Sequence, residues 1–448
     1  MIKPRPYSER ARKIVHMAMG AFALLLRYIP WWQAAILGGV AMAFNLLILP
    51  RVAPHLYRPT ERERFPAGIV FYPASIVLLV LTFPDRLDIV AAAWGILAIG
   101  DGMATLAGQA FGRTRIPWNR EKSVQGSCAL FLFGGLAGAT LAWWCRPAVV
   151  PPAYLWFSLA APFAAAFVAA LVETIPVRLD DNISVPASSA LVLWGLSLVS
   201  EDLVWTTARQ VAPSIAIIAG LNAVIAAAGY LAGTVTRAGA IGGGMIGVAI
   251  AATTGWRGWL LLFTTFMVAA VSSRLGLHRK TLLGIAEERG GRRGVGNAVA
   301  NTGLAAGAAL MSSLTYAHDA ALLAFAAALT AGGSDTVASE IGKAWGRRTY
   351  LVTNFQKVPP GTPGAVSLEG TVAGVVAALA LGVVAILLGI IPQRALVVVV
   401  VAATVSSMVE GWLAVTLEGP GILNNDWLNF LNTAVAVVIA LLLSEAIS

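Results

Sequence analysis

The sequence predicts an all-α polytopic membrane protein of about 15 transmembrane helices, arranged as two parallel-repeat modules with a cytoplasmic N-terminus. Of its 448 residues, 58% are hydrophobic and 12% are charged, about half of the roughly 25% charge found in soluble domains. The mean hydropathy is +0.77. Apolar runs recur at about the 20 residues that a bilayer-spanning helix requires. These observations exclude an ordinary soluble enzyme and leave little of the chain for a soluble domain.

Apolar runs bounded by charged residues or proline place the predicted spans. In the first module, residues 1–205, they lie near residues 15–29, 32–49, 67–83, 88–110, 125–144, 154–173 and 184–200. In the second module, residues 206–448, they lie near residues 213–232, 238–254, 257–274, 294–311, 317–337, 366–391, 394–416 and 427–446. The N-terminal segment has no small-residue cleavage site closely after its first apolar run, so we expect it to be retained.

The charge pattern predicts the orientation of the chain. The net charge is +9, which in a soluble protein would suggest a nucleic-acid partner. Here Lys and Arg are concentrated in short segments between apolar runs, so we predict no nucleic-acid partner. Cytoplasmic segments are rich in Lys and Arg, so we expect the basic N-terminal segment to be cytoplasmic; it contains Lys3, Arg5, Arg10, Arg12 and Lys13. Strict alternation then places these segments on the same side of the membrane: residues 51–66, 112–124, 174–183, 275–293, 343–365 and 417–426. We therefore expect a multi-pass protein of the bacterial inner (cytoplasmic) membrane, with active sites facing the cytoplasm.

One constellation of polar residues occurs twice in the sequence. The first stretch, residues 100–127, reads GDGMATLAGQAFGRTRIPWNREKSVQGS. The second, residues 332–371, reads GGSDTVASEIGKAWGRRTYLVTNFQKVPPGTPGAVSLEGT. In each, an Asp inside an apolar segment is followed by glycines, by basic residues and, at nearly equal distance, by a lysine: Asp101 and Lys122, then Asp335 and Lys357. Because alternation puts both stretches on the cytoplasmic side, the repeat is predicted to be parallel.

The repeated acids are the strongest functional signal. A carboxylate inside a membrane is costly unless it is paired, solvated or bound to a metal, so Asp101 and Asp335 are functional candidates. The structural alternative is a helix-end carboxylate paired with a nearby arginine, but recurrence with the same neighbours favours function. Carboxylates for Mg²⁺, basic residues for phosphate oxygens and glycine backbone amides together suit phosphoryl or nucleotidyl transfer.

Other chemistries fit the sequence less well. It contains no Walker A motif and no protein-kinase glycine-rich loop. A GxG within residues 293–303 opens an apolar span and not a βαβ unit, which argues against a dinucleotide fingerprint. Cys128, Cys145 and the four scattered histidines provide neither a disulfide framework nor a zinc site.

The first half of the chain, roughly residues 8–200, resembles the dolichol kinase and phytol kinase family of membrane polyprenol kinases. The resemblance rests on three blocks in order: SERARKIVHMAMG, GDGMATLAGQAFGRTRIPWNREKSVQGS and VETIPVRLDDNISVP. It implies transfer of a phosphoryl group, typically from CTP, to the hydroxyl of a long isoprenoid alcohol.

The second half, roughly residues 213–448, is similar to the membrane family that includes phytyl-phosphate kinase. Four segments carry the similarity: SSRLGLHRKTLLGIAEERGGRRGVGNAVANTG, GGSDTVASEIGKAWG, KVPPGTPGAVSLEGT and GILNNDWLNFLNT. The implied reaction converts a prenyl monophosphate to the diphosphate with a nucleoside triphosphate. One departure is Ser407, which stands before Met408 and Glu410 where a carboxylate is expected in this family.

The two resemblances imply a set of site residues. The expected catalytic carboxylates are Asp101, Glu173, Asp181, Asp335, Glu410 and Asp426. The expected nucleotide- and phosphate-binding residues are Arg113, Arg115, Lys122, Ser123, Gly126, Lys343, Lys357, Gly361, Thr362, Gly364 and Ser367. The expected metal ligands are Asp101, Asp180, Asn182, Asp335 and Asn425. Substrate-binding or structural roles are expected for Arg12, Lys13, His16, Asn297 and Asn301.

A fusion of the two families predicts a bifunctional isoprenoid kinase. It would convert an alcohol of the phytol or geranylgeraniol type to the monophosphate and then to the diphosphate, with Mg²⁺ as cofactor and CTP or ATP as donor. Its partners would be the bilayer, the alcohol, the monophosphate and the nucleotide, and the sequence indicates no oligomeric state. Two alternatives stay open: a transporter or flippase with a site near the membrane midplane, and a CTP-dependent lipid cytidylyltransferase.

Overall fold

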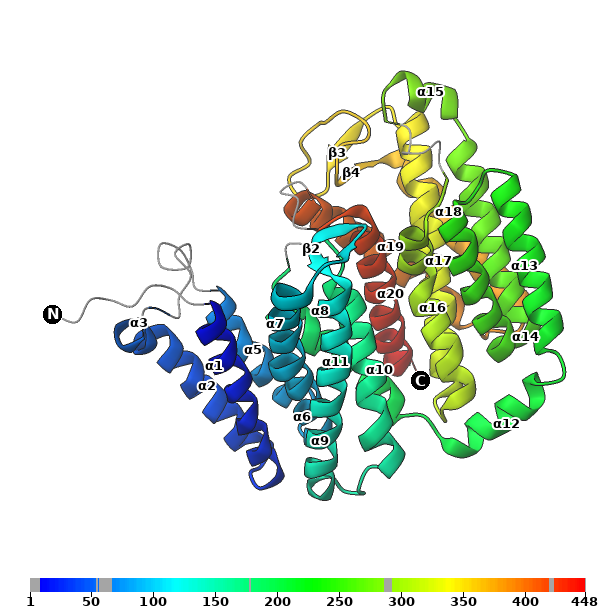
Figure 1. Cartoon of the computed structure of the whole chain (residues 1–448). Helices are drawn as coiled ribbons and strands as arrows, with labels where there is room; N and C mark the ends of the chain where they lie inside the picture. Colours follow the sequence, from blue (N-terminus) through cyan, green and yellow to red (C-terminus); the bar gives the residue numbers. More distant parts are fainter. Residues whose placement is uncertain are drawn as a thin grey trace. The chain divides into compact units, whose positions relative to one another are not determined.

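The computed structural model describes residues 9–53, 55, 67–176, 179–285, 292–418 and 423–447. These residues form helices almost throughout, with two short β-hairpins (Figure 1). Parts of several predicted features lie outside the described residues: Lys3 and Arg5 of the basic N-terminal segment, Val177 and Arg178, and residues 56–66, 286–291 and 419–422 of the predicted cytoplasmic segments. The chain divides into two compact units, Met1–Leu198 and Val199–Ser448.

The first unit begins with four helical segments: α1 (Glu9–Met19), η1 (Gly20–Arg27), α2 (Trp31–Leu47) and α3 (Leu49–Val52). The next segments are α5 (Ala67–Thr82), α6 (Leu87–Gly95), η3 (Ile96–Asp101) and α7 (Gly102–Phe111). An antiparallel hairpin of β1 (Arg115–Ile116) and β2 (Asn119–Ser123) leads into α8 (Val124–Ala129), η4 (Leu130–Gly134), α9 (Gly135–Cys145) and η5 (Arg146–Ala148). The unit ends with α10 (Leu155–Glu173) and α11 (Asp181–Ser197).

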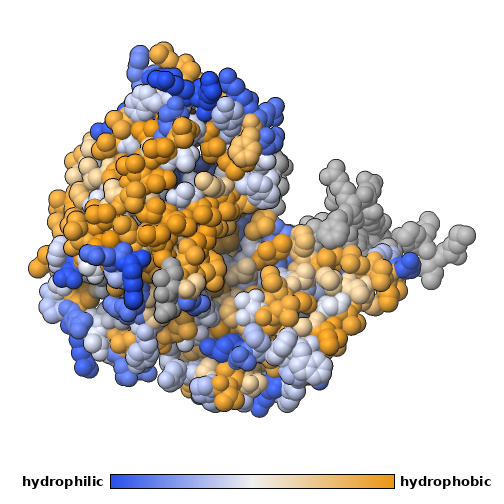
Figure 2. Space-filling view, turned by 180° about the vertical axis from the view of Figure 1, so that it is seen from behind, coloured by the Kyte–Doolittle hydropathy of each residue, from blue (hydrophilic) through white to orange (hydrophobic). Residues whose placement is uncertain are grey.

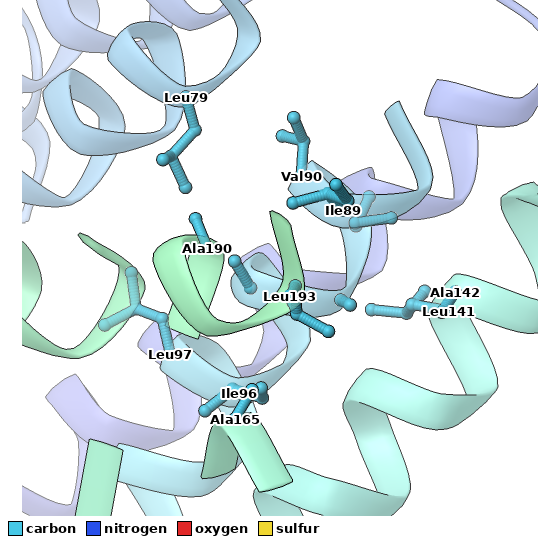
Figure 3. Packing of buried hydrophobic residues seen from close by; sticks show 14 of the residues in the cluster. Leu79, Ile89, Val90, Ile96, Leu97, Leu141, Ala142, Ala165, Ala190 and Leu193 are labelled. Atoms are coloured by element: carbon cyan, nitrogen blue, oxygen red, sulfur yellow. The ribbon is translucent and has the colours of Figure 1, made fainter. Parts of the chain in front are cut away.

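Small buried side chains let the helices of the first unit pack closely around α6. Figure 3 shows residues of α6 and η3 among those of α9, α10 and α11, including Ile89, Ile96, Leu141, Ala165 and Leu193. The segments η3 and η4 are π-helical, a departure from α geometry that is frequent at functional sites. They touch where a Cβ built on Gly100 would lie 3.1 Å from the Cα of Gly134. The close approach lies next to Asp101, the last residue of η3.

The second unit begins with α12 (Glu201–Val211), α13 (Ile215–Leu231), α14 (Arg237–Arg274) and α15 (Leu277–Leu282). Next are α16 (Val295–Leu314) and α17 (His318–Trp345), then the antiparallel hairpin of β3 (Thr349–Leu351) and β4 (Ala365–Ser367). The unit closes with α18 (Leu368–Leu387), α19 (Ala395–Leu413), π-helical η7 (Ala414–Glu418) and α20 (Asn425–Ile447). Its alanine-rich core surrounds α17, which packs against α16, α18, α19 and α20.

The chain is an integral multi-pass membrane protein. Figure 2 shows wide areas of the surface covered by apolar side chains, with hydrophilic residues gathered in separate patches. Within the described residues, eight helices are long and apolar enough to cross a membrane: Leu87–Phe111, Val124–Ala148, Leu155–Glu173, Arg237–Arg274, His318–Trp345, Leu368–Leu387, Ala395–Glu418 and Asn425–Ala446. The count rises to nine if the bent pair α11 and α12 forms one span.

The predicted number of about 15 spans is not confirmed. Three further predicted spans are shorter apolar helices, Trp31–Leu47, Gly68–Thr82 and Ile215–Leu231. Two predicted spans, near 238–254 and 257–274, correspond to the two parts of α14 on either side of Gly255. Gly255 interrupts that helix with a φ of 68°, a left-handed conformation that glycine adopts without steric penalty. The parallel arrangement of two modules stays a prediction.

Candidate active sites

Asp101 is the centre of the acidic cluster in the first unit. It ends η3 inside the span Leu87–Phe111, and its side chain is only 4% exposed. The ammonium of Lys13 on α1 donates a hydrogen bond of 2.6 Å to Asp101 Oδ2. His16 Nε2 lies one turn further along α1, 3.3 Å from the same oxygen and 3.2 Å from the carbonyl oxygen of Leu97. Arg12 is half-buried on the same helix.

Glu173 and Asp181 come from different helix ends and meet at Lys122. Lys122 Nζ donates to Glu173 Oε1 at 2.6 Å and to Asp181 Oδ2 at 3.0 Å. Burial alone would lower the pKa of the Lys122 ammonium, but the two carboxylates raise that pKa above its ordinary value. The lysine therefore stays charged at neutral pH and balances part of the negative charge of the cluster.

The three carboxylates form an arrangement that suits a divalent cation. One oxygen each of Asp101, Glu173 and Asp181 lies within 4.8 Å of the others. In a Mg²⁺ octahedron with bonds of about 2.1 Å, opposite ligands are about 4.2 Å apart, and oxygen is the preferred ligand. Small side-chain adjustments would bring these oxygens onto one ion, so the donor set fits Mg²⁺.

Asp180 and Asn182, both predicted metal ligands, flank this cluster. Asp180 caps α11, because its Oδ1 accepts hydrogen bonds from the backbone N–H of Asn182 at 2.9 Å and from Asn182 Nδ2 at 2.7 Å. Within the described part of the chain, the buried Oδ1 of Asn182 has no hydrogen-bond partner. Asp180 therefore has a structural role at the helix start, whereas Asn182 presents an unused acceptor.

The first hairpin is anchored beside Glu173. Trp118 Nε1 donates to Thr174 Oγ1 at 3.2 Å, which ties the hairpin turn to the end of α10. Arg113 and Arg115 are exposed at this hairpin. Arg115 reaches across to the carbonyl oxygen of Glu121 at 3.3 Å. Both arginines are placed to meet a ligand that approaches from the hairpin side, and neither pairs with the three carboxylates in the described structure.

The second unit carries its own acidic site on α17 and α19. Ser407 Oγ donates to Asp335 Oδ1 at 2.7 Å. The carboxyl of Glu410, 8% exposed, interacts directly with that of Asp335. Among the described residues, Glu410 Oε2 has no hydrogen-bond partner. The two acids face a cavity of about 430 Å³ that also exposes these predicted residues: Asn297, Lys343, Gly361, Thr362, Gly364, Ser367 and Asn425.

The loop between β3 and β4 forms one wall of this cavity. Gly361 and Gly364 have φ angles of 85° and 72°, which side chains larger than glycine adopt only with strain. A Cβ on Gly364 would collide with the backbone oxygen of Gly411 on α19. The loop therefore approaches α19 closely with its backbone, a geometry suited to binding phosphate oxygens through N–H groups.

The two units share a local framework around their aspartates. Equal spacing in the sequence relates three pairs: Asp101 with Asp335, Gly108 with Gly342, and Gly112 with Gly346. After each hairpin a serine caps the next helix. Ser123 Oγ accepts from the N–H of Gly126 at 3.2 Å, and Ser367 Oγ accepts from the N–H of Gly370 at 3.1 Å. The position directly before the capping serine is Lys122 in the first unit and Val366 in the second.

Three other predicted residues do not line the cavity of the second acidic pair. Lys357 is exposed on the hairpin loop and does not line the cavity. Asp426 lies against Gly296 at the start of α16. Asn301 lines a separate apolar cavity, which Asn297 also reaches.

Sequence reasoning missed a buried ion pair in the second unit. Lys280 on α15 and Glu340 on α17 are 1% and 2% exposed. Lys280 Nζ bonds to Glu340 Oε2 and donates to the carbonyl oxygen of Ser273 at 2.8 Å, while Lys343 Nζ approaches Glu340 Oε1 at 3.3 Å. One feature of the sequence indicates one partner of this ion pair: Glu340 is a second acid in the same apolar segment as Asp335.

The fold and the two acidic clusters define a polytopic helical membrane protein whose candidate sites are built from carboxylates of neighbouring helices. The chain belongs to the family described as integral membrane protein DUF92, whose profile matches residues 220–437. It is 37% identical over 202 residues to an uncharacterized membrane protein of Synechocystis, a match that covers 44% of the chain and 78% of that protein.

The chain is also similar to two plant proteins. It is 32% identical over 243 residues to the chloroplastic protein VTE6 of Arabidopsis thaliana, covering 52% of the chain and 67% of VTE6. It is 27% identical over 161 residues to chloroplastic phytol kinase 1 of the same plant, covering 36% of the chain and 52% of that kinase. The match thus spans about half of the phytol kinase. No solved structure matches the chain.

Proposed function

We propose that the chain is a membrane prenyl-lipid kinase with one active site in each unit. The first unit would phosphorylate a prenyl alcohol, and the second would phosphorylate the resulting monophosphate to the diphosphate. The single observation that carries the proposal is the cluster of Asp101, Glu173 and Asp181, in which Glu173 and Asp181 bind Lys122 of the first hairpin. Similarity to a plant phytol kinase supports the same class of reaction.

In the first unit, the reaction begins with a hydroxyl group that must lose its proton. The alcohol oxygen attacks the γ-phosphorus of the nucleotide, the bond to the β-phosphate oxygen breaks, and the nucleoside diphosphate leaves. Asp101 would orient the hydroxyl and take its proton, with Lys13 and His16 holding the carboxylate in place. Lys122 and the hairpin arginines would neutralise phosphate oxygens, and a bound Mg²⁺ would supply further positive charge.

In the second unit, the attacking group is already an anion, because the second pKa of a phosphate monoester is about 6. The site must therefore bring two negatively charged phosphates together and needs less help with proton removal. Asp335 and Glu410 would hold Mg²⁺, and Lys343 with the backbone of the loop at Gly361 and Gly364 would bind phosphate oxygens. A site for proton removal in the first unit and a site for two phosphates in the second unit match the proposed order of substrates, alcohol and then monophosphate.

The experiment that tests the proposal supplies the purified full chain in lipid with labelled CTP or ATP, Mg²⁺, and phytol, geranylgeraniol or their monophosphates. The expected result is labelled monophosphate from the alcohols and labelled diphosphate from the monophosphates. A CDP-linked lipid would replace the kinase proposal with cytidylyl transfer. Failure to label any of the lipids would overturn the enzyme proposal and favour a transporter.

A further inference from the structure

The second unit contains another cavity, of about 150 Å³, which the reaction described above does not use. Its walls come from α13, α14, α16 and α17, helices that lie side by side in the second unit (Figure 1). The lining is mostly apolar or glycine and includes Ile225, Ala226, Gly243, Phe263 and Phe266.

Polar side chains that line this cavity form hydrogen bonds with each other or with backbone carbonyl oxygens. Asn222 Oδ1 accepts from Trp259 Nε1 at 3.0 Å, and Asn222 Nδ2 donates to the carbonyl oxygen of Ile218 at 2.9 Å. Asn301 Nδ2 donates to the carbonyl oxygen of Asn297 at 3.0 Å. A ligand in this space would therefore meet chiefly carbon atoms, so the cavity suits an apolar chain.

The apolar cavity adjoins the acidic one. Arg293 and Asn297 line both. Arg293 is held at this junction, since its Nη2 donates to the carbonyl oxygen of Ala269 and to Ser273 Oγ, each at 3.3 Å. A cationic side chain at the border of an apolar and an acidic cavity is placed to bind the phosphate of a lipid whose chain enters the apolar side.

We infer that this cavity binds the first part of the prenyl chain of the monophosphate substrate, with the phosphate at Arg293 facing Asp335. The inference rests on the proposed function of the second unit. Pockets that enclose a whole drug-sized ligand measure about 300–1,000 Å³, so a cavity of about 150 Å³ would hold only the beginning of a long chain. The remainder would lie in the bilayer.

Two glycines provide a matched test. Gly243 on α14 lines the cavity, and a Cβ built there meets nothing within 4 Å. Gly307 on α16 is equally open, but it lines neither cavity. Gly243→Leu should therefore fill the cavity without disturbing its own packing, and Gly307→Leu controls for adding the same side chain to a membrane helix.

The experiment measures KM and kcat for geranylgeranyl monophosphate and kcat/KM for methyl phosphate, which has no chain to place in the cavity. Gly243→Leu should raise KM for the long-chain substrate by about tenfold, the loss of contacts with about two methylene groups. Its kcat and its activity on methyl phosphate should stay within about twofold of wild type. Gly307→Leu should leave all these values unchanged.

Equal KM values for both variants and wild type would overturn the tail-site inference while leaving the kinase proposal intact. A wild-type chain that phosphorylates no monophosphate would instead overturn the proposed function. If Gly243→Leu also loses activity on methyl phosphate, Gly243→Ala decides the matter. Its single methyl should raise the long-chain KM about threefold, and an unchanged KM would contradict the inference.

Discussion

The two acidic sites share a framework but differ in where their lysines lie. In the first unit, Lys13 binds Asp101 and Lys122 bridges Glu173 and Asp181. In the second, Asp335 accepts from Ser407 and adjoins Glu410, while the lysines of the same region, Lys280 and Lys343, bind Glu340.

This difference shows that two sites with the same backbone framework can carry different arrangements of charged side chains. The serine-capped helix after each hairpin is the same, yet Lys122 is replaced by Val366 at the position before the cap. Two adjacent buried carboxylates without a bonded lysine need a metal ion or a shared proton to be stable. The second site should therefore depend more strongly on Mg²⁺ than the first.

The largest effect should follow from Asp101→Asn, which tests whether the first unit contains an active site separate from that of the second unit. Loss of the carboxylate should lower alcohol phosphorylation by roughly 10²–10³-fold, the scale seen when a key electrostatic group is removed. Monophosphate phosphorylation should stay within about twofold. Initial rates with labelled nucleotide measure both, and Asp85→Asn, an exposed acid outside the described sites, is the control. Parallel loss of both activities in Asp101→Asn would argue against separate sites.

Lys280→Met tests whether the buried lysine of the second unit is structural. It leaves the Glu340 carboxylate buried without its main partner, which should lower the free energy of unfolding by about 3 kcal/mol. The double variant Lys280→Met/Glu340→Met should recover much of that loss, because no buried charge stays unpaired. Thermal denaturation in lipid or detergent measures both variants. Equal destabilisation of the single and double variants would contradict a charge-pairing role.

Lys122→Met removes the lysine that binds the carboxylates of the first site, so that this site resembles the second one, where Asp335 and Glu410 have no bonded lysine among the described residues. Lys122 is partly exposed, so we expect a loss of only about 2 kcal/mol in stability. The Mg²⁺ concentration needed for half-maximal alcohol phosphorylation should also change, since the ion and the lysine neutralise the same acids. A magnesium titration compared with wild type measures this effect, and an unchanged titration would speak against a shared site.

The pH dependence of the Lys122 contribution follows from its raised pKa. The charge of the Lys122 ammonium stabilises the folded protein at pH values below the unfolded lysine pKa of about 10.4. That stabilisation is lost only as pH rises above this value, through the folded pKa. The stability difference between wild type and Lys122→Met, measured by thermal denaturation, should therefore decrease as the pH rises above about 10.4.

The smallest effect should come from Lys357→Ala. Lys357 is exposed and lies outside the cavity that Lys343 lines. Its loss should change stability by less than about 0.5 kcal/mol and monophosphate phosphorylation by less than about twofold, whereas Lys343→Ala should lower that activity at least tenfold. Similar losses in the two variants would mean that the exposed loop closes over the substrate.

Hydrophobicity alone indicated the helical membrane fold, because a bilayer imposes a long apolar run on each span. The predicted number of spans is not confirmed, since helices such as Trp31–Leu47 are apolar but short. Asp101 belongs to one block of sequence and Glu173 and Asp181 to another, and the fold brings the three together. The role of each stays a prediction.

The sequence alone does not indicate which side chains from distant segments form ion pairs in the folded protein. The contact of Lys280 with Glu340 depends on how α15 folds back against α17, and no local spacing encodes it. The correspondence between Lys122 and Lys357, drawn from their similar distances to an aspartate, also differs from the three-dimensional arrangement. The longer second hairpin loop shifts Lys357 away from the capping serine.

The central claim is that two separate sites act in succession on one lipid, and product analysis of Asp335→Asn tests it most directly. The variant is supplied with geranylgeraniol, Mg²⁺ and labelled nucleotide, and the lipids are separated over time. The account predicts that monophosphate accumulates at a rate close to that of wild type and that diphosphate formation falls by at least about 10²-fold. Diphosphate formation at the wild-type rate, or the absence of monophosphate, would contradict it.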